Sequence, residues 1–148
     1  MTAPTATRNL GYMPPGIASF TAQPANATEL GLMVVGTAVK MQTTQNPGLV
    51  DQAIGTGTTA VNRPVGVLFT QPTAIGDEVN VVTSGVCKAL AGGTLTVGMA
   101  LQATAAGKLI DAPYATTGTY LIMGYALQNA ASGEMFTMLV APSVIKTA

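Results

Sequence analysis

Residues 63–83 read RPVGVLFTQPTAIGDEVNVVT and contain two strand-like runs joined by a segment that should turn. The first run, 64–70, is rich in β-branched and aromatic residues, which are typical of strands. Residues 71–76 include Pro72 and Gly76, which favour a turn or a short loop. From residue 78 polar and apolar side chains alternate, as they do in a strand with one polar face. The stretch therefore predicts an antiparallel β-hairpin.

The same spacing recurs at two later places in the chain. In each copy a glutamine is followed five residues later by a glycine and then by a charged residue, in the segments 71–77, 102–108 and 128–134. A glycine at the point where a loop turns back can adopt a positive φ without steric cost. We therefore expect three hairpins around one core, with backbone-required turn glycines at Gly76, Gly107 and Gly133.

Short strand-like segments with glycine punctuation continue from residue 30 towards the end of the chain. They lie at 32–43, 49–54, 65–70, 78–83, 86–91, 100–103, 108–111, 120–128 and 134–141. Turn signals about every eight to twelve residues, with little helical periodicity, are typical of an all-β sandwich or barrel. Residues 94–98 fit either a strand or one helical turn. We predict one small β-barrel or sandwich of short antiparallel hairpins over residues 30–148.

Residues 1–29 differ from the rest because they contain four prolines and almost no periodicity. Such a segment sustains neither a helix nor an alternating strand. Its apolar side chains suggest an extended arm that docks on another surface, and a disordered tail is the alternative. Removal of residues 2–25 should then leave a folded domain. The expected contacts of the arm are Arg8, Leu10, Tyr12, Ile17 and Phe20.

Charged side chains make up only 8% of the sequence, against about 25% in ordinary globular chains. Six basic residues balance six acidic ones, so no basic stripe is available for phosphates, and nucleic-acid binding is not expected. A surface with few charges is a solubility liability for a free monomer. Much of it should be covered by copies of the chain or by a partner, unless Thr, Gln, Asn and Ser alone make it sufficiently polar.

The segments 121–127 and 136–140 carry apolar side chains on both faces. Antiparallel strands of this kind are usually covered on both sides. One side should be the domain core, and the other a subunit interface of a closed oligomer. This reasoning predicts a homotrimer whose interface contains Tyr120, Ile122, Met138 and Leu139.

The residue types needed for common catalytic sites are missing. Without histidine, neither a Ser-His-Asp triad nor a Cys-His pair can form. The one cysteine, Cys87, lies in a short apolar run and is expected to be a buried structural thiol. We expect no enzyme activity, metal or cofactor. We also expect no membrane association, because the longest nearly apolar stretch, 30–39, is about half the length of a bilayer span.

Six motifs, in this order and spacing, resemble a family of small tailed-phage head proteins known as capsid cement or decoration proteins. They are Arg63–Leu68, Gly76–Val81, Thr94–Leu101, Gly107–Leu109, Met123–Leu127 and Ser132–Glu134. The resemblance covers residues 31–141. It implies a β-barrel that is made in the host cytoplasm and trimerises on the outer surface of the virion head. There it would clamp subunits of the major capsid protein together, without catalytic residues.

Two other classes stay open at this stage. A trimeric tail or fibre component would share the composition, although it should show longer repeats or an elongated shaft. A small carbohydrate-binding module would need clustered aromatic residues. Three Phe, four scattered Tyr and no Trp give that class little support.

Overall fold

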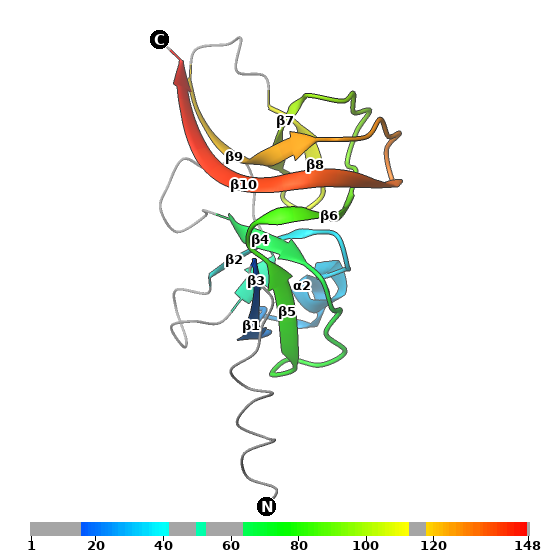
Figure 1. Cartoon of the computed structure of the whole chain (residues 1–148). Coiled ribbons are helices and arrows are strands. Elements are labelled where there is room, and N and C mark those ends of the chain that lie inside the picture. The colour runs from blue at the N-terminus through cyan, green and yellow to red at the C-terminus, as the bar shows by residue number, and fades with distance from the viewer. Residues whose placement is uncertain (1–15, 42–49, 53–63, 113–117, 148) are drawn as a thin grey trace, which may run out of the picture.

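The computed structural model describes residues 16–41, 50–52, 64–112 and 118–147, and these fold into two antiparallel sheets (Figure 1). Sheet A has the strand order β1-β5-β4-β2-β3, and sheet B has the order β6-β10-β9-β7-β8. The predicted all-β class is confirmed, as a sandwich-like pair of sheets. Among the described residues, no helix has the length and apolarity needed to cross a membrane.

Sheet A comes from the first part of the chain and sheet B from the second. Sheet A consists of β1 (Ile17–Thr21), β2 (Ala38–Met41), β3 (Val50–Gln52), β4 (Pro64–Leu68) and β5 (Glu78–Val82). Sheet B consists of β6 (Gly85–Leu90), β7 (Ala100–Ala103), β8 (Leu109–Asp111), β9 (Gly118–Ala126) and β10 (Met135–Thr147). A short helix, α2 (Ala27–Leu32), lies between β1 and β2 in the sequence.

The three repeated segments form hairpin connections. They join β4 to β5, β7 to β8 and β9 to β10, and each pair is antiparallel. Gly76, Gly107 and Gly133 have φ angles of 99°, 77° and 86°, which a residue with a side chain rarely adopts. Residues 94–98 form neither a strand nor a helical turn. Within this segment, Leu95 makes an isolated β-bridge to Ala130.

The main core lies between the two sheets. Sheet A contributes Ala38, Val67 and Val82, and sheet B contributes larger side chains such as Phe136 and Met138, both fully buried. A second cluster, which includes Met33, Val39, Leu68, Val79 and Val81, packs beside sheet A. Both faces of sheet A are therefore covered by the chain itself.

Residues 17–33 belong to the folded unit, which corrects the expectation that the sheets begin near residue 30. β1 pairs with β5 over its whole length, from Ile17 opposite Val82 to Thr21 opposite Glu78. Ile17 packs against the core between the sheets and Phe20 against the second cluster, so these two side chains are not free arm contacts. The segment 17–21 is too short, and its apolar residues too few, to indicate a strand within a proline-rich stretch.

Helix α2 was also absent from the sequence-based prediction, which placed a strand from residue 32. Asn26 is the N-cap, and its side-chain oxygen accepts a hydrogen bond from the Glu29 amide at 2.9 Å. The Glu29 carboxylate in turn accepts a hydrogen bond from the Ala25 amide at 2.8 Å. Side-chain caps of this kind satisfy amides that the helix leaves unpaired, which helps a helix of only six residues to form.

Strands β9 and β10 form a long, strongly curved pair (Figure 1). The register shifts between Val140 and Ser143, which is a β-bulge at Pro142, a position where proline is tolerated within a sheet. On the partner strand, Gly124 has a φ of 151°. Around Leu121–Met123 the chain covers both faces of β9.

The burial of two predicted interface residues, Met138 and Ile122, corrects the interface expected on β9 and β10. Met138 is fully buried in the core between the sheets. Ile122 is 1% exposed in a separate cluster with Ala100 and Ala112, against which Tyr120 also packs. Around Leu121–Met123 both faces of β9 are apolar because the same chain covers both. Only Leu139, among the four predicted interface residues, reaches the outer face of sheet B.

Candidate interaction surfaces

The outer face of sheet B carries an exposed row of apolar side chains across three adjacent strands. Val86 of β6 lies opposite Leu139 of β10, which lies opposite Tyr125 of β9. Val86 is 64% exposed and Tyr125 is 38% exposed, and Leu127, two residues after Tyr125, is also exposed. We call Val86, Leu139, Tyr125 and Leu127 the sheet B face. Contiguous apolar side chains on a sheet surface are typical of a protein contact.

A hydrogen-bonded polar row lies beside the sheet B face. The Lys88 amine donates to the Thr137 hydroxyl at 2.8 Å and to the Gln128 side-chain oxygen at 3.2 Å. The same Gln128 oxygen accepts a hydrogen bond from the Thr137 hydroxyl at 3.1 Å. These bonds hold one positive charge across β6, β10 and the end of the β9 segment. The apolar row thus has a polar border, as in many protein interfaces.

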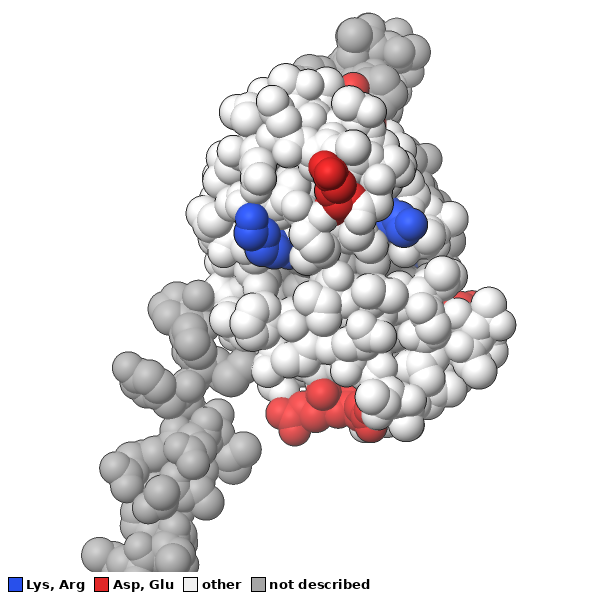
Figure 2. Space-filling view, turned by 90° about the vertical axis from the view of Figure 1, so that its right-hand side faces the viewer, with Lys and Arg blue, Asp and Glu red and all other residues white. Residues whose placement is uncertain are grey.

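Charges are sparse on the molecular surface shown in Figure 2, where single blue and red residues are separated by wide uncharged areas. Only twelve residues of the full sequence carry a formal charge, six of each sign. Identical copies with such surfaces repel one another little. The surface therefore suits dense packing of copies or contact with a larger protein lattice.

A groove lies along the free edge of β6, where this strand faces the end of sheet A. Its volume is about 330 Å³. Ile17, Leu68 and Val82 line its buried side, and the exposed side chains Phe69 and Val86 lie along its rims. We call this feature the β6 groove. Lys88 is the one charged residue among the residues that line it.

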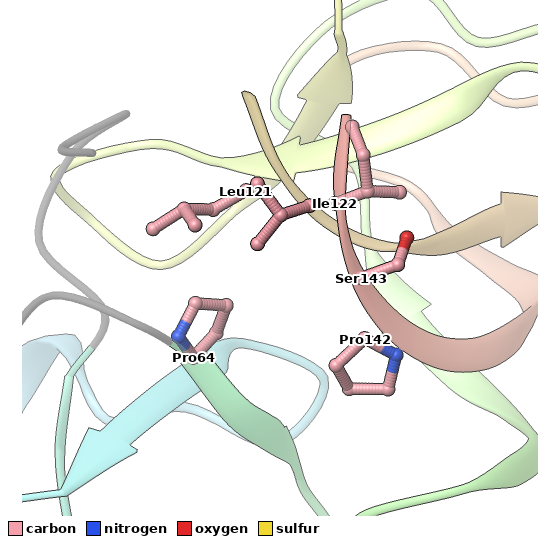
Figure 3. Close-up of a pocket in the computed structure, with 6 residues that line it drawn as sticks. Pro64, Leu121, Ile122, Pro142 and Ser143 are labelled. Atoms are coloured by element: carbon pink, nitrogen blue, oxygen red, sulfur yellow. The ribbon is translucent and has the colours of Figure 1, made fainter. Parts of the chain in front are cut away.

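A smaller pocket separates the start of β4 from the curved pair β9–β10 (Figure 3). Its volume is about 120 Å³, and its lining residues are Pro64, Leu121, Ile122, Pro142, Ser143 and Val144. The Ser143 hydroxyl is the only side-chain polar group among them. Ser143 lies in a strand and not on a helix, so its spacing from Lys146 does not form the Ser-x-x-Lys arrangement of acyl-transfer enzymes.

A third pocket, of about 380 Å³, lies between residues 94–96 and 129–134. Its polar groups serve the local backbone, because Asn129 accepts a hydrogen bond from the Val97 amide and Glu134 from the Ala131 amide. Among the described residues that line it, none is aromatic.

The comparisons with known proteins address the class of the molecule directly. The profile of the phage cement protein family matches residues 33–142. The chain belongs to the phage cement protein family. The match includes β2 to β9 and the first half of β10, and it excludes β1 and α2. No match was found among curated protein sequences.

Among solved structures, this cement-family protein resembles the head fiber gp8.5 N base of bacteriophage phi29. The TM-score is 0.62, the sequence identity is 19%, and the likeness covers 88% of this chain and 99% of that one. At this identity the likeness establishes a shared fold. Together with the family, it identifies a structural virion protein of the phage head. Membership in such a family also favours a non-enzymatic role.

The predicted contact residues fall into three groups in this cement-family protein. Arg8, Leu10 and Tyr12 lie outside the described residues. Ile17 and Phe20 are part of β1, and Ile17 reaches one side of the β6 groove. Sequence reasoning missed Val86 as a surface residue, because a valine in an apolar run gives no sign that its strand lies at a sheet edge.

The only thiol in the chain is poorly suited to chemistry. Cys87 is half-buried and not fully buried as expected, and this partial burial still raises the pKa of its thiol to about 11, because desolvation disfavours the thiolate. No group of three or more potential metal ligands occurs among the described residues. The arrangement therefore offers contact surfaces and no reactive centre in the part of the chain that the structure describes.

The raised pKa gives a labelling prediction. Alkylation of Cys87 by iodoacetamide should be slow at pH 7.5 and should accelerate steadily up to pH 11, because the thiolate is the reactive form. Urea-unfolded protein should react at the rate of an ordinary cysteine. Mass spectrometry of timed samples measures both rates. Equal rates for the folded and unfolded protein at pH 7.5 would contradict the burial of this thiol.

Proposed function

We propose that this protein decorates the outer surface of a phage head and cements it by clamping neighbouring subunits of the major capsid protein. The family match supports a role in the head, and the sheet B face supplies a physical means of binding. The observation that carries the proposal is the row Val86–Leu139–Tyr125, which is apolar, exposed at both ends, half-buried at Leu139 and bordered by a hydrogen-bonded lysine. The protein acts as a homotrimer in this proposal.

Cementing of this kind works by mass action and needs no covalent step. A protein that binds the assembled shell but not separated subunits stabilises the shell by the free energy of that binding. Aromatic and aliphatic side chains at the centre of a contact usually supply most of this energy. Each copy need contribute only a few kcal/mol, because many copies act on one shell.

Charge placed on the sheet B face should weaken binding to heads. We expect Tyr125→Asp and Leu127→Asp each to reduce affinity at least tenfold, which is about 1.4 kcal/mol, because a carboxylate would lose water at an apolar contact. Both side chains are more than a third exposed, so the fold should survive. Co-sedimentation of purified protein with bare heads measures the affinity. Ile75→Asp is the control, because Ile75 is 47% exposed on a sheet A loop.

Heads carrying the wild-type protein should also release their DNA at a higher temperature than bare heads, and heads mixed with Leu127→Asp should not. Wild-type affinity in both sheet B variants would show that capsid binds elsewhere. Equal thermal stability of decorated and bare heads would refute the cementing role itself.

A second candidate role is the base of a fibre on the head. The observation that favours it is the shared fold with the N base of a phage head fiber. The two roles differ in copy number and in attached partners. Quantitative mass spectrometry of purified virions separates them, because a cement protein should be abundant relative to the major capsid protein, and a fibre base should accompany a stoichiometric shaft protein.

A further inference from the structure

The outward edge of β6 is an open hydrogen-bonding edge in the described part of the chain. β6 pairs with β10 on one side only. On its other side the Leu90 amide donates to the Gly36 carbonyl at 2.8 Å. Because backbone groups alternate along a strand, Val86 and Lys88 direct theirs to the same side as Leu90. No described strand pairs with these two residues on that side. Such an edge can accept an additional strand.

The β6 groove lies along this open edge and offers an apolar base for such a strand. Leu68 and Val82 are almost fully buried beneath it, and Phe69 is 55% exposed at its rim. Its volume is about 330 Å³. It therefore has room for large side chains of an incoming segment, whose entry would remove apolar surface from water.

The first fifteen residues of the chain join the fold at this groove. The Gly16 carbonyl accepts hydrogen bonds from the amides of Thr83 at 2.6 Å and Ser84 at 3.4 Å. Ser84 and the next residue after Gly16, Ile17, both line the groove. Fully extended, the seven residues 9–15 reach about 24 Å. The segment is thus attached at the rim of a groove and can reach a copy that packs directly beside it.

The sequence of this segment fits the groove. Residues 9–13 read NLGYM and carry no charge. In an extended chain, Leu10 and Tyr12 project to the same side. Two large apolar side chains on one side, with backbone groups free to pair, are what an apolar groove beside an open strand edge recognises.

Pro14 and Pro15 favour docking on another copy over docking on the same one. A proline keeps the preceding residue extended, so Met13 and Pro14 are both restricted to extended conformations, and the ring of Pro15 fixes its own φ. The segment's own groove begins at Ile17, so reaching it would require a sharp reversal next to this stiff stretch. We propose that residues 9–13 of one copy bind in the β6 groove of a neighbouring copy as an added strand. This proposal rests on the proposed assembly of copies on the head, and it names the contact that links them.

Disulfide trapping in the purified protein tests the proposal. The variant carries Cys87→Ser to remove the native thiol, together with Tyr12→Cys and Val86→Cys, because Val86 is 64% exposed at the groove rim. Mild oxidation should give covalent multimers on a non-reducing gel. The matched control combines Cys87→Ser and Tyr12→Cys with Val97→Cys. Val97 is 57% exposed but does not line the groove, so this variant should stay at least tenfold less cross-linked.

Each outcome decides between occupants. A disulfide within one chain, seen as an oxidised monomer by mass spectrometry, would show that the segment fills its own groove and would overturn exchange between copies. Absence of any Tyr12→Cys to Val86→Cys product, or equal cross-linking of the Val97→Cys control, would overturn the groove as the docking site. A second measurement uses the native cysteine background. Phe69→Asp should reduce self-association at least tenfold by sedimentation, and an unchanged association constant would count against the proposal.

Failure here is distinguishable from failure of the proposed function. The trapping experiment uses purified protein without heads and reports only on contacts between copies. The head-binding experiment reports on the sheet B face through Tyr125→Asp and Leu127→Asp. Cross-linked multimers that do not bind heads would retain the groove contact and refute cementing. Protein that stays monomeric but binds heads with wild-type affinity would refute the groove contact and leave the proposed head binding intact.

Discussion

Gly124→Ala should cost the protein about 3 kcal/mol or more of folding stability, the largest effect expected of any single substitution considered. A Cβ atom at this position would overlap the carbonyl oxygen of Leu139 on the adjacent strand. The φ of 151° adds strain for any residue with a side chain. The clash is with backbone at the bulge of β9 and β10, so the strand pair itself must shift. Urea unfolding followed by circular dichroism measures the loss.

Gly133→Ala is the matched control for this substitution. Gly133 also has a positive φ, of 86°, but an added Cβ would have no heavy atom within 4 Å. The expected loss is therefore about 1 kcal/mol, from backbone strain alone. The comparison separates the cost of the clash with Leu139 from the cost of a positive φ in a residue with a side chain. If the two variants lose equal stability, the tight contact between β9 and β10 is not what requires glycine at 124.

The hairpins could be predicted from sequence because their signals are local. A glycine and a charged residue at a fixed spacing mark each turn, and the glycine carries a backbone requirement that no other residue meets as well. The glutamine of the same repeat carries no common role. Gln102 is 5% exposed, whereas Gln128 is exposed and bonded to Thr137. The three copies of the repeat therefore share their turn geometry.

The interface on β9 and β10 could not be predicted, because apolar residues on both faces of a strand can be covered either by the same chain or by a second subunit. Ile122 and Met138 are apolar since parts of the same chain cover them, and a second subunit would leave the same sequence pattern. The pattern also does not reveal that β6 is an edge strand, which depends on pairing between distant segments. The sheet B face and the β6 groove therefore emerge only when the strands are assembled.

Strand β1 was missed because its evidence is almost entirely non-local. Residues 17–21 alternate poorly, yet they complete sheet A by pairing with β5. The following residue, Ala22, is fully buried; its amide donates a hydrogen bond to the Asp77 carbonyl, and its carbonyl accepts one from the Gly76 amide. The proline-rich composition around β1 obscured this. Residues 17–22 consequently belong to the folded unit, which changes what a truncation should do.

Deletion of residues 2–25 should prevent stable folding, contrary to what the sequence alone suggested. It would remove β1, with the packed side chains of Ile17 and Phe20, and the buried Ala22. Ile17 and Phe20 are partly buried, so their loss costs at most about 3–6 kcal/mol, and the lost β1–β5 hydrogen bonds add to this. That is comparable to the whole stability of a typical domain, which is about 5–15 kcal/mol.

Deletion of residues 2–13 is the matched comparison, because it leaves Gly16 and all of β1 in place. This shorter truncation should unfold in urea at the same midpoint as an unassociated full-length chain, and it should lose self-association at least tenfold if residues 9–13 link copies through the β6 groove. Circular dichroism and sedimentation on both deletions measure the two effects separately. A longer deletion that remained as stable as the shorter one would mean that β1 contributes little to sheet A. A shorter deletion that unfolded would instead place residues before Gly16 in the core, because nothing in β1 itself would have changed.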